Sequence, residues 1–382
     1  MAAKLKVMTI FGTRPEAIKM APLVLELEKN TEDIESIVAV TAQHREMLDQ
    51  VLEIFNVKPD YDLNIMKDRQ TLTEVTTRAL EGLDRVMKEV KPDIVLVHGD
   101  TTTTFVASLA AFYNQIAVGH VEAGLRTWNK FSPFPEEMNR QLTGIMADLH
   151  FSPTDTAAQN LLAENKSGDA IYVTGNTAID ALNTTVRDMY SHEVLEELGD
   201  DRLILVTAHR RENLGEPMEN MFRAIKRLVD DHDDVRVVYP VHLNPVVRET
   251  ADKILGNDSR IRLIEPLGVI DFHNFASRAH LILTDSGGVQ EEAPSLGVPV
   301  LVLRDTTERP EGIQAGTLKL AGTDEETIYS LASELLTDDD AYEAMSQASN
   351  PYGDGQASRR IVEAILYHFK KRDERPDTFR VI

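Results

Sequence analysis

The sequence predicts an α/β protein built from two doubly wound parallel sheets, and three observations support this fold class. Short runs of β-branched and apolar residues alternate with stretches of helical periodicity along the whole chain. These runs do not alternate with polar residues, which is typical of parallel strands buried on both faces. The chain has 382 residues, and at about 150 residues per domain this length accommodates two or three domains. Strand–helix alternation over such a length favours two sheets in tandem.

The predicted strands are spread evenly over the chain. Those of the first half are Leu5–Phe11, Ser36–Thr41, Asp93–His98, Ala117–Val121, Leu149–Phe151 and Ile171–Thr174. Those of the second half are Leu203–Thr207, Val235–Pro240, Ile261–Ile264, Leu281–Thr284, Val300–Leu303 and Thr317–Leu320. Helical periodicity separates nearly all of them, and the clearest examples are Leu72–Val90, Met218–Asp231 and Asp324–Leu336. This number of strands is larger than is usual for one sheet, and we therefore divide the chain into two domains.

The predicted domain boundary lies after residue 175. There the last strand of the first half is followed by a polar helix and then by an acidic stretch that ends at Asp201. We therefore assign residues 1–175 to the first domain and 176–354 to the second. The closing segment, about 355–382, has the pattern of one amphipathic helix and then a tail of mixed charge, which we expect to be frayed.

The composition excludes several classes of function. Lys and Arg number 40 and Asp and Glu 63, so the formal net charge is −23, which disfavours nucleic acid and anionic membrane surfaces as partners. The sequence has no cysteine, so disulfides, thiolate metal sites and cysteine nucleophiles are excluded. The 11 histidines show no zinc-binding spacing, and we expect no metal. The first apolar run, about seven residues, is too short for a signal peptide or a membrane span, so we expect a cytoplasmic protein.

Two cations follow the first predicted strand. In open α/β sheets, ligands bind at the carboxyl ends of the strands, at the point where the strand order reverses. Arg14 and Lys19 lie at or near the start of the following helix, whose positive end favours an anion. A helix start with two solvated cations is the alternative. The turn lacks the GxGxxG pattern of dinucleotide-binding proteins, so it gives no support for a nicotinamide cofactor.

Three carboxylates of the first half are acid/base candidates: Asp100, Glu122 and Glu136. If adjacent strands bring their loops together, burial and like-charge repulsion would raise at least one pKa, which suits a general acid or base. Asp100 could instead be a helix N-cap, and Glu122 could pair with Arg126. Glu136 is also an ordinary acid for a first helical turn. The four threonines after Asp100 are poor helix formers, so we expect their hydroxyls to be available to a ligand.

A histidine and two arginines follow a strong strand in the second half. His209, Arg210 and Arg211 combine the means for anion recognition with those for proton chemistry. A solvated loop is the alternative. His242 follows another strand and is weaker evidence when it is taken alone.

The strongest local signal is a glycine pair between a strand and a helix. Ser286, Gly287 and Gly288 offer bare backbone N–H groups at the start of that helix, which predicts a diphosphate cradle. Glu292, one turn into the helix, could accept hydrogen bonds from ribose hydroxyls. The segment around Arg309, after the next strand, supplies further cations.

Many blocks of the sequence are similar to one enzyme family. They are FGTRPEAIKMAPL (Phe11–Leu23), TAQHREMLDQVL (Thr41–Leu52), HGDTTTT, GHVEAGLRT, TAHRREN, YPVHLNP, LTDSGGVQEEAPSLG, RDTTERPE and NPYGDGQASRRI. From about Leu5 to Arg360 the chain resembles the non-hydrolysing bacterial UDP-N-acetylglucosamine 2-epimerases. The resemblance implies two Rossmann-like domains of the glycosyltransferase-B type that face a central cleft, with the C-terminal helix crossing back onto the first. It also implies a homodimer and no cofactor.

The activity that the resemblance implies is the interconversion of UDP-GlcNAc and UDP-ManNAc, which supplies ManNAc for cell-surface polysaccharide or teichoic acid linkage units. UDP is eliminated to give a 2-acetamidoglucal and is added back after the proton returns to the opposite face of carbon 2. Carbon 2 has no neighbouring carbonyl, so its proton can leave only if the anomeric bond to UDP also breaks. The enzyme must therefore stabilise the departing diphosphate and hold acid and base on two faces of one carbon.

The resemblance also assigns roles to residues, by matching positions. The acid/base group is Asp100, Glu122, Glu136 and His209. The nucleotide-sugar contacts are Arg14, Lys19, Phe272, Ser286, Gly287, Gly288, Glu292 and Arg309. A second UDP-GlcNAc site, for an allosteric activator, is formed by Gln43, His44, Arg69, Gln70, Arg210 and His242, with Glu136 bordering both sites. Two positions depart from the pattern: Glu46, where some relatives have Gln, and Trp128, where relatives usually have Gly.

Three other functions compete with the epimerase. A UDP-sugar glycosyltransferase of the same fold would need an acceptor and would release UDP. A hydrolysing 2-epimerase would release free ManNAc and UDP. A nucleotide-sugar sensor would keep the glycine cradle and would tolerate the loss of Glu122.

Overall fold

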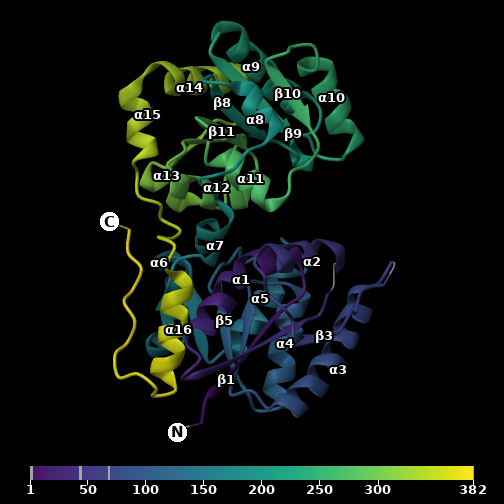
Figure 1. The fold of residues 1–382 in the computed structure, drawn as a ribbon, viewed down its shortest axis with the longest axis vertical. Coiled ribbons are helices and arrows are strands. Elements are labelled where there is room, and N and C mark those ends of the chain that lie inside the picture. Colours follow the sequence, from purple (N-terminus) through teal and green to yellow (C-terminus); the bar gives the residue numbers. More distant parts are fainter. Residues whose placement is uncertain (1–2, 43–44, 68, 382) are drawn as a thin grey trace. The chain divides into compact units, whose positions relative to one another are not determined.

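The computed structural model describes residues 3–42, 45–67 and 69–381, which form two compact units. The first unit extends to Asn183 and includes Gly353–Arg380, and the second is Thr184–Tyr352. Each unit has one sheet, and all strand pairs in both sheets are parallel (Figure 1). The predicted fold class is therefore confirmed. None of the helices in the described ranges is both long and apolar enough to cross a membrane.

The first unit contains a seven-stranded sheet in the order β3-β2-β1-β4-β5-β6-β7. Its strands are β1 (Leu5–Phe11), β2 (Ile34–Val40), β3 (Tyr61–Asp62), β4 (Ile94–His98), β5 (Ala117–Val121), β6 (Leu149–Ser152) and β7 (Ile171–Val173). Because β1 pairs with β2 on one side and with β4 on the other, the strand order reverses between β1 and β4.

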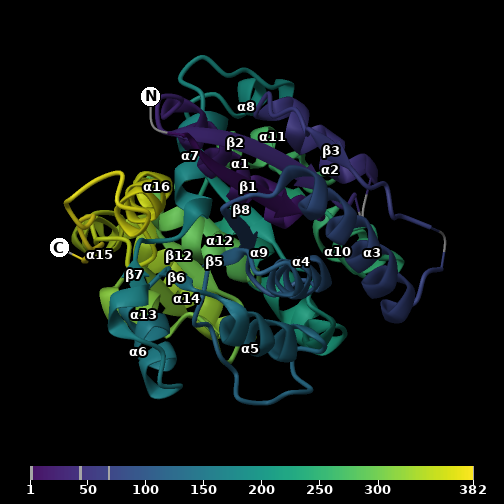
Figure 2. The ribbon, with the colours of Figure 1, turned by 90° about the horizontal axis from the view of Figure 1, so that it is seen from below.

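Helices cover both faces of the first sheet. They are α1 (Arg14–Lys29), α2 (Arg45–Ile54), α3 (Leu72–Val90), α4 (Thr102–Tyr113), α5 (Glu136–Met146), α6 (Asp155–Ala163), α7 (Thr177–Thr185) and α16 (Ala357–His368). The helices α1, α2 and α16 share one core with β1 and β2. The helices α3 and α4 form the core of the opposite face, where Figure 2 shows them side by side. Burial on both faces explains the continuous apolar runs of β1 and β4.

The second unit contains a six-stranded sheet in the order β10-β9-β8-β11-β12-β13. Its strands are β8 (Arg202–Thr207), β9 (Val235–Pro240), β10 (Ile261–Ile264), β11 (Leu281–Thr284), β12 (Val300–Val302) and β13 (Leu318–Leu320). Its helices are α8 (Glu193–Leu198), α9 (Glu216–Asp231), α10 (Pro245–Leu255), α11 (Val269–Ala276), α12 (Gly287–Glu292), α13 (Pro310–Ala315), α14 (Glu325–Thr337) and α15 (Asp339–Ser346). Here the strand order reverses between β8 and β11.

The predicted strands are all present, with ends that differ by no more than about two residues. The helix α3 has the predicted bounds because Thr71 and Glu74 cap its first turn, each accepting a hydrogen bond from the backbone N–H of the other. The strand β3 was not predicted. It has two residues, Tyr61 and Asp62, which pair with the end of β2, and a run that short has no periodicity.

The boundary between the units lies within α7, between Asn183 and Thr184, rather than after residue 175. Asp180 of α7 is buried, and its carboxylate accepts hydrogen bonds from the backbone N–H groups of Ala357 (3.1 Å) and Ser358 (2.7 Å) at the start of α16. These bonds cap α16, and they tie α7 to the helix with which the chain returns to the first unit.

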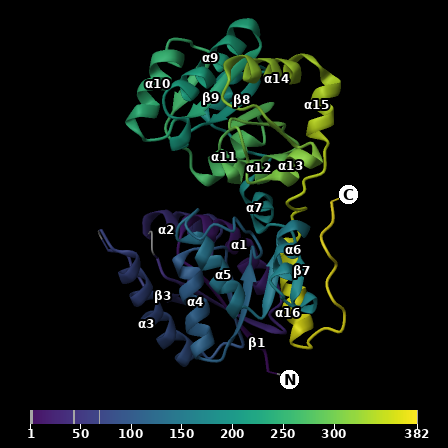
Figure 3. The same cartoon turned by 180° about the vertical axis from the view of Figure 1, so that it is seen from behind.

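The expectation of a frayed C-terminal tail is wrong. After α16 the chain turns back and runs beside α16 and β7 (Figure 3). The side chain of Phe379 is buried, and its N–H donates to the carbonyl of Val173 (2.9 Å). Arg360 binds the carboxylate of Asp377 (3.0 Å). A buried aromatic and paired charges hold the tail against the first unit, and neither is visible in the mixed-charge composition.

Candidate active site

Two groups of predicted residues lie where the strand order reverses. In the first unit, Arg14 and Lys19 follow β1, and Asp100 follows β4. In the second unit, His209 follows β8 and Ser286 follows β11. Each sheet therefore has candidate site residues at its switch point, where ligands of such sheets bind.

The turn after β1 is organised by a buried carboxylate. Glu16 Oε2 accepts hydrogen bonds from the N–H of Gly12 (3.0 Å) and from the N–H of Thr13 (2.8 Å). Its other oxygen accepts from the hydroxyl of Thr101, 2.6 Å away, and so joins the turn to the loop after β4. A Cβ atom on Gly12 would lie 1.9 Å from the hydroxyl oxygen of Thr41. Only glycine fits there, and the turn presents Arg14 at the first residue of α1.

Glu122, directly after β5, is the most enclosed of the three predicted carboxylates. Its Oε2 atom lies 2.5 Å from Lys19 Nζ and 2.7 Å from His98 Nε2. The three side chains are 10%, 18% and 6% exposed, in the order Glu122, Lys19, His98. The backbone of Glu122 has a φ of 61°, a left-handed conformation that is uncommon for a residue with a side chain and is often found at functional sites.

The pKa of Glu122 is set by the cations beside it. Burial raises the pKa of Glu122, but the charges of Lys19 and His98 and their hydrogen bonds outweigh burial and hold this pKa well below its ordinary value of 4.5. The sequence predicted that, if the three carboxylates converge, at least one of their pKa values is raised. For Glu122 the pKa is lowered instead, because cations, and not carboxylates, lie nearest to it. Glu122 is therefore an ionised carboxylate at neutral pH and is able to accept a proton.

Asp100 is held by α5. Its carboxylate pairs with the guanidinium of Arg140, and its carbonyl accepts a hydrogen bond from the side-chain amide of Asn139 (2.9 Å). Arg140 also lies 3.3 Å from Glu137, which is fully buried. Glu136 begins α5, one helical turn before Asn139 and Arg140, and so lies on the face that contacts the Asp100 loop.

The alternatives for Asp100 and Glu122 fail in the structure, whereas Glu136 does stand in the first turn of α5. The N-cap of α4 is Thr101 and not Asp100, because the Thr101 hydroxyl accepts from the N–H of Thr104. Arg126 pairs with Glu164 (2.6 Å) and not with Glu122.

The threonines after Asp100 are also not a row of free hydroxyls. Thr103 and Thr104 are fully buried. The Thr103 hydroxyl lies 3.0 Å from that of Thr41, and the Thr104 hydroxyl contacts Glu16 (3.2 Å). These threonine hydroxyls form hydrogen bonds within the protein around the turn, and they are not available to a ligand.

The loop between β5 and α5 contains Trp128, one of the two positions that depart from the family pattern. The N–H of Trp128 donates to Glu137 Oε1 (3.1 Å). Its indole is 60% exposed and faces solvent.

A buried aspartate organises the switch point of the second unit. Asp285 is 0% exposed, and its Oδ2 atom accepts hydrogen bonds from the N–H of His209 (2.9 Å) and of Arg210 (2.8 Å). The amide of Asn213 donates to the same oxygen (3.2 Å). Arg210 Nε donates to the carbonyl of Asp285 (3.1 Å). The loop after β8 is thus fixed to the end of β11, which excludes a merely solvated loop.

His209 lies beside a second histidine. Its ring stacks on that of His242, with centroids 5.4 Å apart, and its Nδ1 atom lies 3.3 Å from Asp285 Oδ1. Burial lowers the pKa of His209 from 6.5, Asp285 opposes this shift, and the charges of His242 and Arg210 add to it. His209 is therefore mostly neutral at pH 7 and able to accept a proton.

The glycine pair lies at the start of α12. A Cβ atom built on Gly287 would lie 3.4 Å from Arg309 Nη2, so the guanidinium of Arg309 covers this turn. Arg309 is positioned by the buried Glu291, whose Oε1 lies 2.5 Å from Arg309 Nε. A Cβ atom on Gly288 would meet no atom within 4 Å. The backbone at Gly288 is open, as a diphosphate cradle requires.

The other predicted nucleotide contacts lie on neighbouring elements. Ser286 is the N-cap residue of α12, and its N–H donates to the hydroxyl of Thr284 (2.9 Å). Glu292 Oε2, at the end of α12, lies 3.4 Å from Nε2 of the buried His273. Phe272 is the neighbour of His273 on α11 and is partly buried in the core beneath the sheet.

The predicted activator residues are described only in part. Gln43 and His44 lie outside the described residues. Arg69 has a φ of 53°, and the side-chain oxygen of Gln70 accepts from Arg78 (2.7 Å). Arg210 and His242 flank His209, as given above.

The sequence interpretation missed four buried polar residues: Glu16, His98, Glu137 and Asp285. The first belongs to a T-x-x-E pattern, Thr13 to Glu16, which is a helix-start signal. His98 and Asp285 stand at the ends of β4 and β11 and could have been found with the strand-end rule that selected Asp100. Nothing in the sequence distinguishes Glu137 from Glu136.

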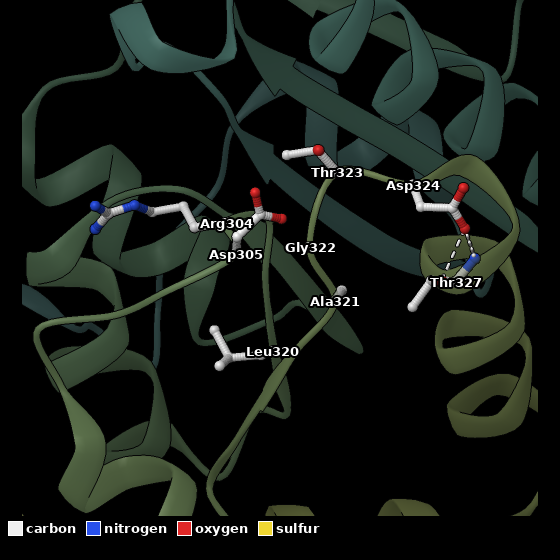
Figure 4. Close-up of a pocket in the computed structure, with 8 residues that line it drawn as sticks. All are labelled: Arg304, Asp305, Leu320, Ala321, Gly322, Thr323, Asp324 and Thr327. Atoms are coloured by element: carbon white, nitrogen blue, oxygen red, sulfur yellow. Dashed lines mark hydrogen bonds between the residues drawn. The ribbon is translucent and has the colours of Figure 1, made fainter.

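The second unit also has a cavity of 360 Å³, at the carboxyl ends of β12 and β13 (Figure 4). Its lining residues are Arg304, Asp305, Leu320, Ala321, Gly322, Thr323, Asp324 and Thr327. Asp324 is engaged as the N-cap of α14, since it accepts from the N–H of Thr327 (2.9 Å). None of the predicted site residues lines this cavity. Within residues 3–42, 45–67 and 69–381, no three His, Asp or Glu side chains are arranged to hold a metal ion.

Comparisons with known proteins agree with the residue patterns. A family model described as UDP-N-acetylglucosamine 2-epimerase matches residues 26–366. A relative of that name from Bacillus subtilis strain 168 is 74% identical over 376 residues, which cover 98% of this chain and 99% of the relative. A crystal structure of a UDP-N-acetylglucosamine 2-epimerase has a TM-score of 0.94 and 72% identity, with 99% of both chains covered. The UDP-GlcNAc 2-epimerase from Neisseria meningitidis, solved bound to UDP-GlcNAc, has a TM-score of 0.83 and 51% identity, over 95% of this chain and 100% of its own.

Proposed function

The chain belongs to the UDP-N-acetylglucosamine 2-epimerase family as an enzyme of the non-hydrolysing bacterial type, and we propose that it interconverts UDP-GlcNAc and UDP-ManNAc by elimination and re-addition of UDP. The observation that carries this proposal is the ionised, enclosed carboxylate of Glu122 at the switch point of the first sheet, beside Lys19 and His98. A proton acceptor and a phosphate-binding cation in contact are what an elimination of diphosphate needs.

The reaction has two halves. In the first, the C2–H bond breaks and its proton passes to an enzyme base, while the C1–O bond breaks and its electron pair leaves with UDP. A double bond between C1 and C2 forms the 2-acetamidoglucal. In the second, a proton is delivered to the opposite face of C2 as a diphosphate oxygen of UDP attacks C1. No electrons are gained or lost overall, so the reaction needs no redox cofactor.

The proposed roles follow the chemistry of the side chains. Asp100, Glu122, Glu136 and His209 form the acid/base group, and the lowered pKa values of Glu122 and His209 mean that both side chains are mainly unprotonated at neutral pH. The diphosphate is bound by cations and open backbone, and the uridine and sugar by the remaining contacts. These binding residues are Arg14, Lys19, Phe272, Ser286, Gly287, Gly288, Glu292 and Arg309.

We also propose the properties that the family resemblance implies beyond the reaction. A second UDP-GlcNAc molecule activates the enzyme through Gln43, His44, Arg69, Gln70, Arg210 and His242. The enzyme acts in the cytoplasm as a homodimer, and its product supplies ManNAc for cell-surface polysaccharide or teichoic acid linkage units. Activation is tested by the rate of UDP-ManNAc consumption, which UDP-GlcNAc at low concentration should increase.

The decisive experiment is proton NMR of UDP-GlcNAc with the protein in deuterated water. We expect UDP-ManNAc to accumulate and deuterium to replace hydrogen at carbon 2 of both epimers. No deuterium at carbon 2 and no UDP-ManNAc would contradict the proposal. Accumulation of free ManNAc and UDP would indicate a hydrolysing enzyme, and UDP release that depends on an added acceptor would indicate a glycosyltransferase.

A further inference from the structure

The ammonium group of Lys19 is paired with a carboxylate in the proposed enzyme. Lys19 Nζ is 2.5 Å from Glu122 Oε2, and both side chains are largely buried. Lys19 is also in the second turn of α1, the helix that begins at Arg14, and both cations are proposed above as nucleotide-sugar contacts. A diphosphate bound there carries more charge than the carboxylate and competes with it for Lys19.

Glu122 has a second partner that does not face this competition. His98 Nε2 lies 2.7 Å from the same oxygen, and His98 is the last residue of β4, at the edge of the sheet core. Its side chain is 6% exposed, against 18% for Lys19. A ring fixed in the sheet can keep Glu122 in place when a flexible lysine side chain moves.

The other titratable groups around Glu122 are engaged elsewhere. His120 of β5 contacts the carbonyl of Gly99 through Nε2, at 2.7 Å. Glu16 of α1 is bound to Thr13 and Thr101, Asp100 of the β4–α4 loop to Arg140, and Arg126 of the β5–α5 loop to Glu164. His150 of β6 is buried, and burial lowers its pKa to about 4, so it is neutral. Lys19 and His98 are thus the groups that set the charge of Glu122.

We propose that Lys19 passes from Glu122 to the diphosphate when a nucleotide sugar binds, so that binding itself frees Glu122 to accept a proton while His98 holds it in place. The inference rests on the proposed function, and it makes His98 a positioning residue and Lys19 the link between binding and catalysis.

The transfer changes the basicity of Glu122 at the right moment. In the free protein Lys19 holds the pKa of Glu122 down, which protects the carboxylate but makes it a weak base. Once Lys19 contacts phosphate, burial raises the pKa of Glu122, and the carboxylate becomes a stronger base only in the complex. A group whose pKa rises on binding takes up protons when the ligand binds.

The test is isothermal titration calorimetry with UDP-GlcNAc at about pH 5, near the ordinary glutamate pKa, in two buffers of different ionisation enthalpy. UDP-GlcNAc is the probe because its diphosphate diester has no proton to lose near neutral pH, and epimerisation neither consumes nor releases protons. We expect uptake of at least about 0.2 proton per bound ligand that is present in the wild type and absent from Glu122→Gln. The difference between the two proteins is the measured quantity, because it cancels proton uptake by groups other than Glu122.

Two further measurements separate the transfer from a static ion pair. Glu122→Gln removes the competitor for Lys19, so it should bind UDP-GlcNAc about threefold to tenfold more tightly. Lys19→Met should bind UDP-GlcNAc at least about tenfold more weakly. It should also lack the part of the proton uptake that is absent from Glu122→Gln. Lys29→Met is the matched control on the same helix, where Lys29 pairs with Glu26 (2.6 Å), and it should keep both properties.

A role for His98 in positioning has its own readout. His98→Gln keeps an N–H donor and should retain most of the turnover number, whereas His98→Ala should lower this number by about tenfold to a hundredfold with little change in KM. If the wild type and Glu122→Gln bind UDP-GlcNAc with equal proton uptake, the proposed transfer of Lys19 is wrong, but the proposed function is not affected. A protein that does not bind UDP-GlcNAc would overturn the proposed function as well.

Discussion

The two switch points hold a buried carboxylate in different ways. In the first unit, Glu122 accepts a hydrogen bond from Lys19 and lies in contact with the side chain of His98. In the second, Asp285 is bound by the backbone N–H groups of His209 and Arg210. Side-chain partners can move away during a reaction cycle, but backbone partners cannot move without unfolding the loop. With the same strand order around both switch points, the carboxylate of the first sheet has movable partners, whereas the carboxylate of the second sheet fixes the loop that carries His209.

The largest expected effect is the loss of turnover in Glu122→Gln. An amide cannot accept the carbon-2 proton, so turnover should fall by about 10²-fold to 10⁴-fold, as for other general bases. The free energy of unfolding should also fall, by about 1–3 kcal/mol, because the amide keeps the volume of the side chain but removes the carboxylate partner of the largely buried Lys19. The rate of UDP-ManNAc formation and urea denaturation measure the two quantities.

Glu26→Gln, on the exposed side of α1, is the control and should change neither quantity. Full activity in Glu122→Gln would contradict the proposed difference between the two switch points, since Glu122 would then have only a structural role, like Asp285.

The next largest effect is a loss of stability in acid that belongs to the first unit. Burial lowers the pKa of His120 to about 3 and that of His150 to about 4, from 6.5. Below pH 6.5 the unfolded chain binds protons that the folded chain does not, so stability falls as the pH falls from about 6.5 to about 4. Each histidine should cost about 2 kcal/mol of unfolding free energy between pH 7 and pH 5.

Urea denaturation at these two pH values checks the expectation, and His150→Gln should remove about half of the loss. An unchanged pH dependence in His150→Gln would show that folding does not lower the pKa of this histidine. His209 is more exposed and is not expected to contribute comparably.

Much of the fold could be predicted from the sequence because buried parallel strands have a strong signal. Val95, Leu96 and Val97 of β4 must be apolar on both faces, and such runs recur at regular intervals. The two-residue strand β3 and the ordered tail lack such a signal, since both depend on a few contacts between distant residues, such as that of Phe379 with Val173.

The sequence could predict which positions form the candidate site, but not which side chains contact one another there. Strand ends and the family resemblance identified Asp100, Glu122 and His209. They did not reveal that Lys19 neutralises Glu122 or that Arg140 binds Asp100, because these pairs join residues far apart in the sequence. The lowered pKa of Glu122 could not be predicted for that reason.

A smaller effect on stability is expected from Asp285→Ala, and it tests the other half of the comparison. Without the carboxylate, the N–H groups of His209 and Arg210 lose their acceptor, which should lower the free energy of unfolding by about 2–4 kcal/mol. Asp324→Ala, which removes the exposed N-cap of α14, should cost about 1 kcal/mol and is the control. Urea denaturation compares the two variants. Normal stability of Asp285→Ala together with loss of turnover would make Asp285 a reacting group and not a structural one.

The smallest effect on stability is expected from Gly288→Ala, and for that reason it isolates binding. A methyl group at this position meets no atom of the protein within 4 Å, and alanine favours a helix over glycine by up to about 1 kcal/mol, so the variant should be as stable as the wild type or slightly more so. The same methyl group occupies the space in which the open backbone is proposed to receive a diphosphate, so the affinity for UDP should fall by about tenfold or more. Gly168→Ala in the first unit, where the nearest atom is 3.9 Å from the added carbon, is the matched control and should leave the affinity unchanged. Calorimetric titration with UDP measures the affinity. If Gly288→Ala binds UDP normally, the rigid loop that Asp285 maintains would serve some purpose other than diphosphate binding. The second switch point could then no longer be described as the diphosphate-binding one.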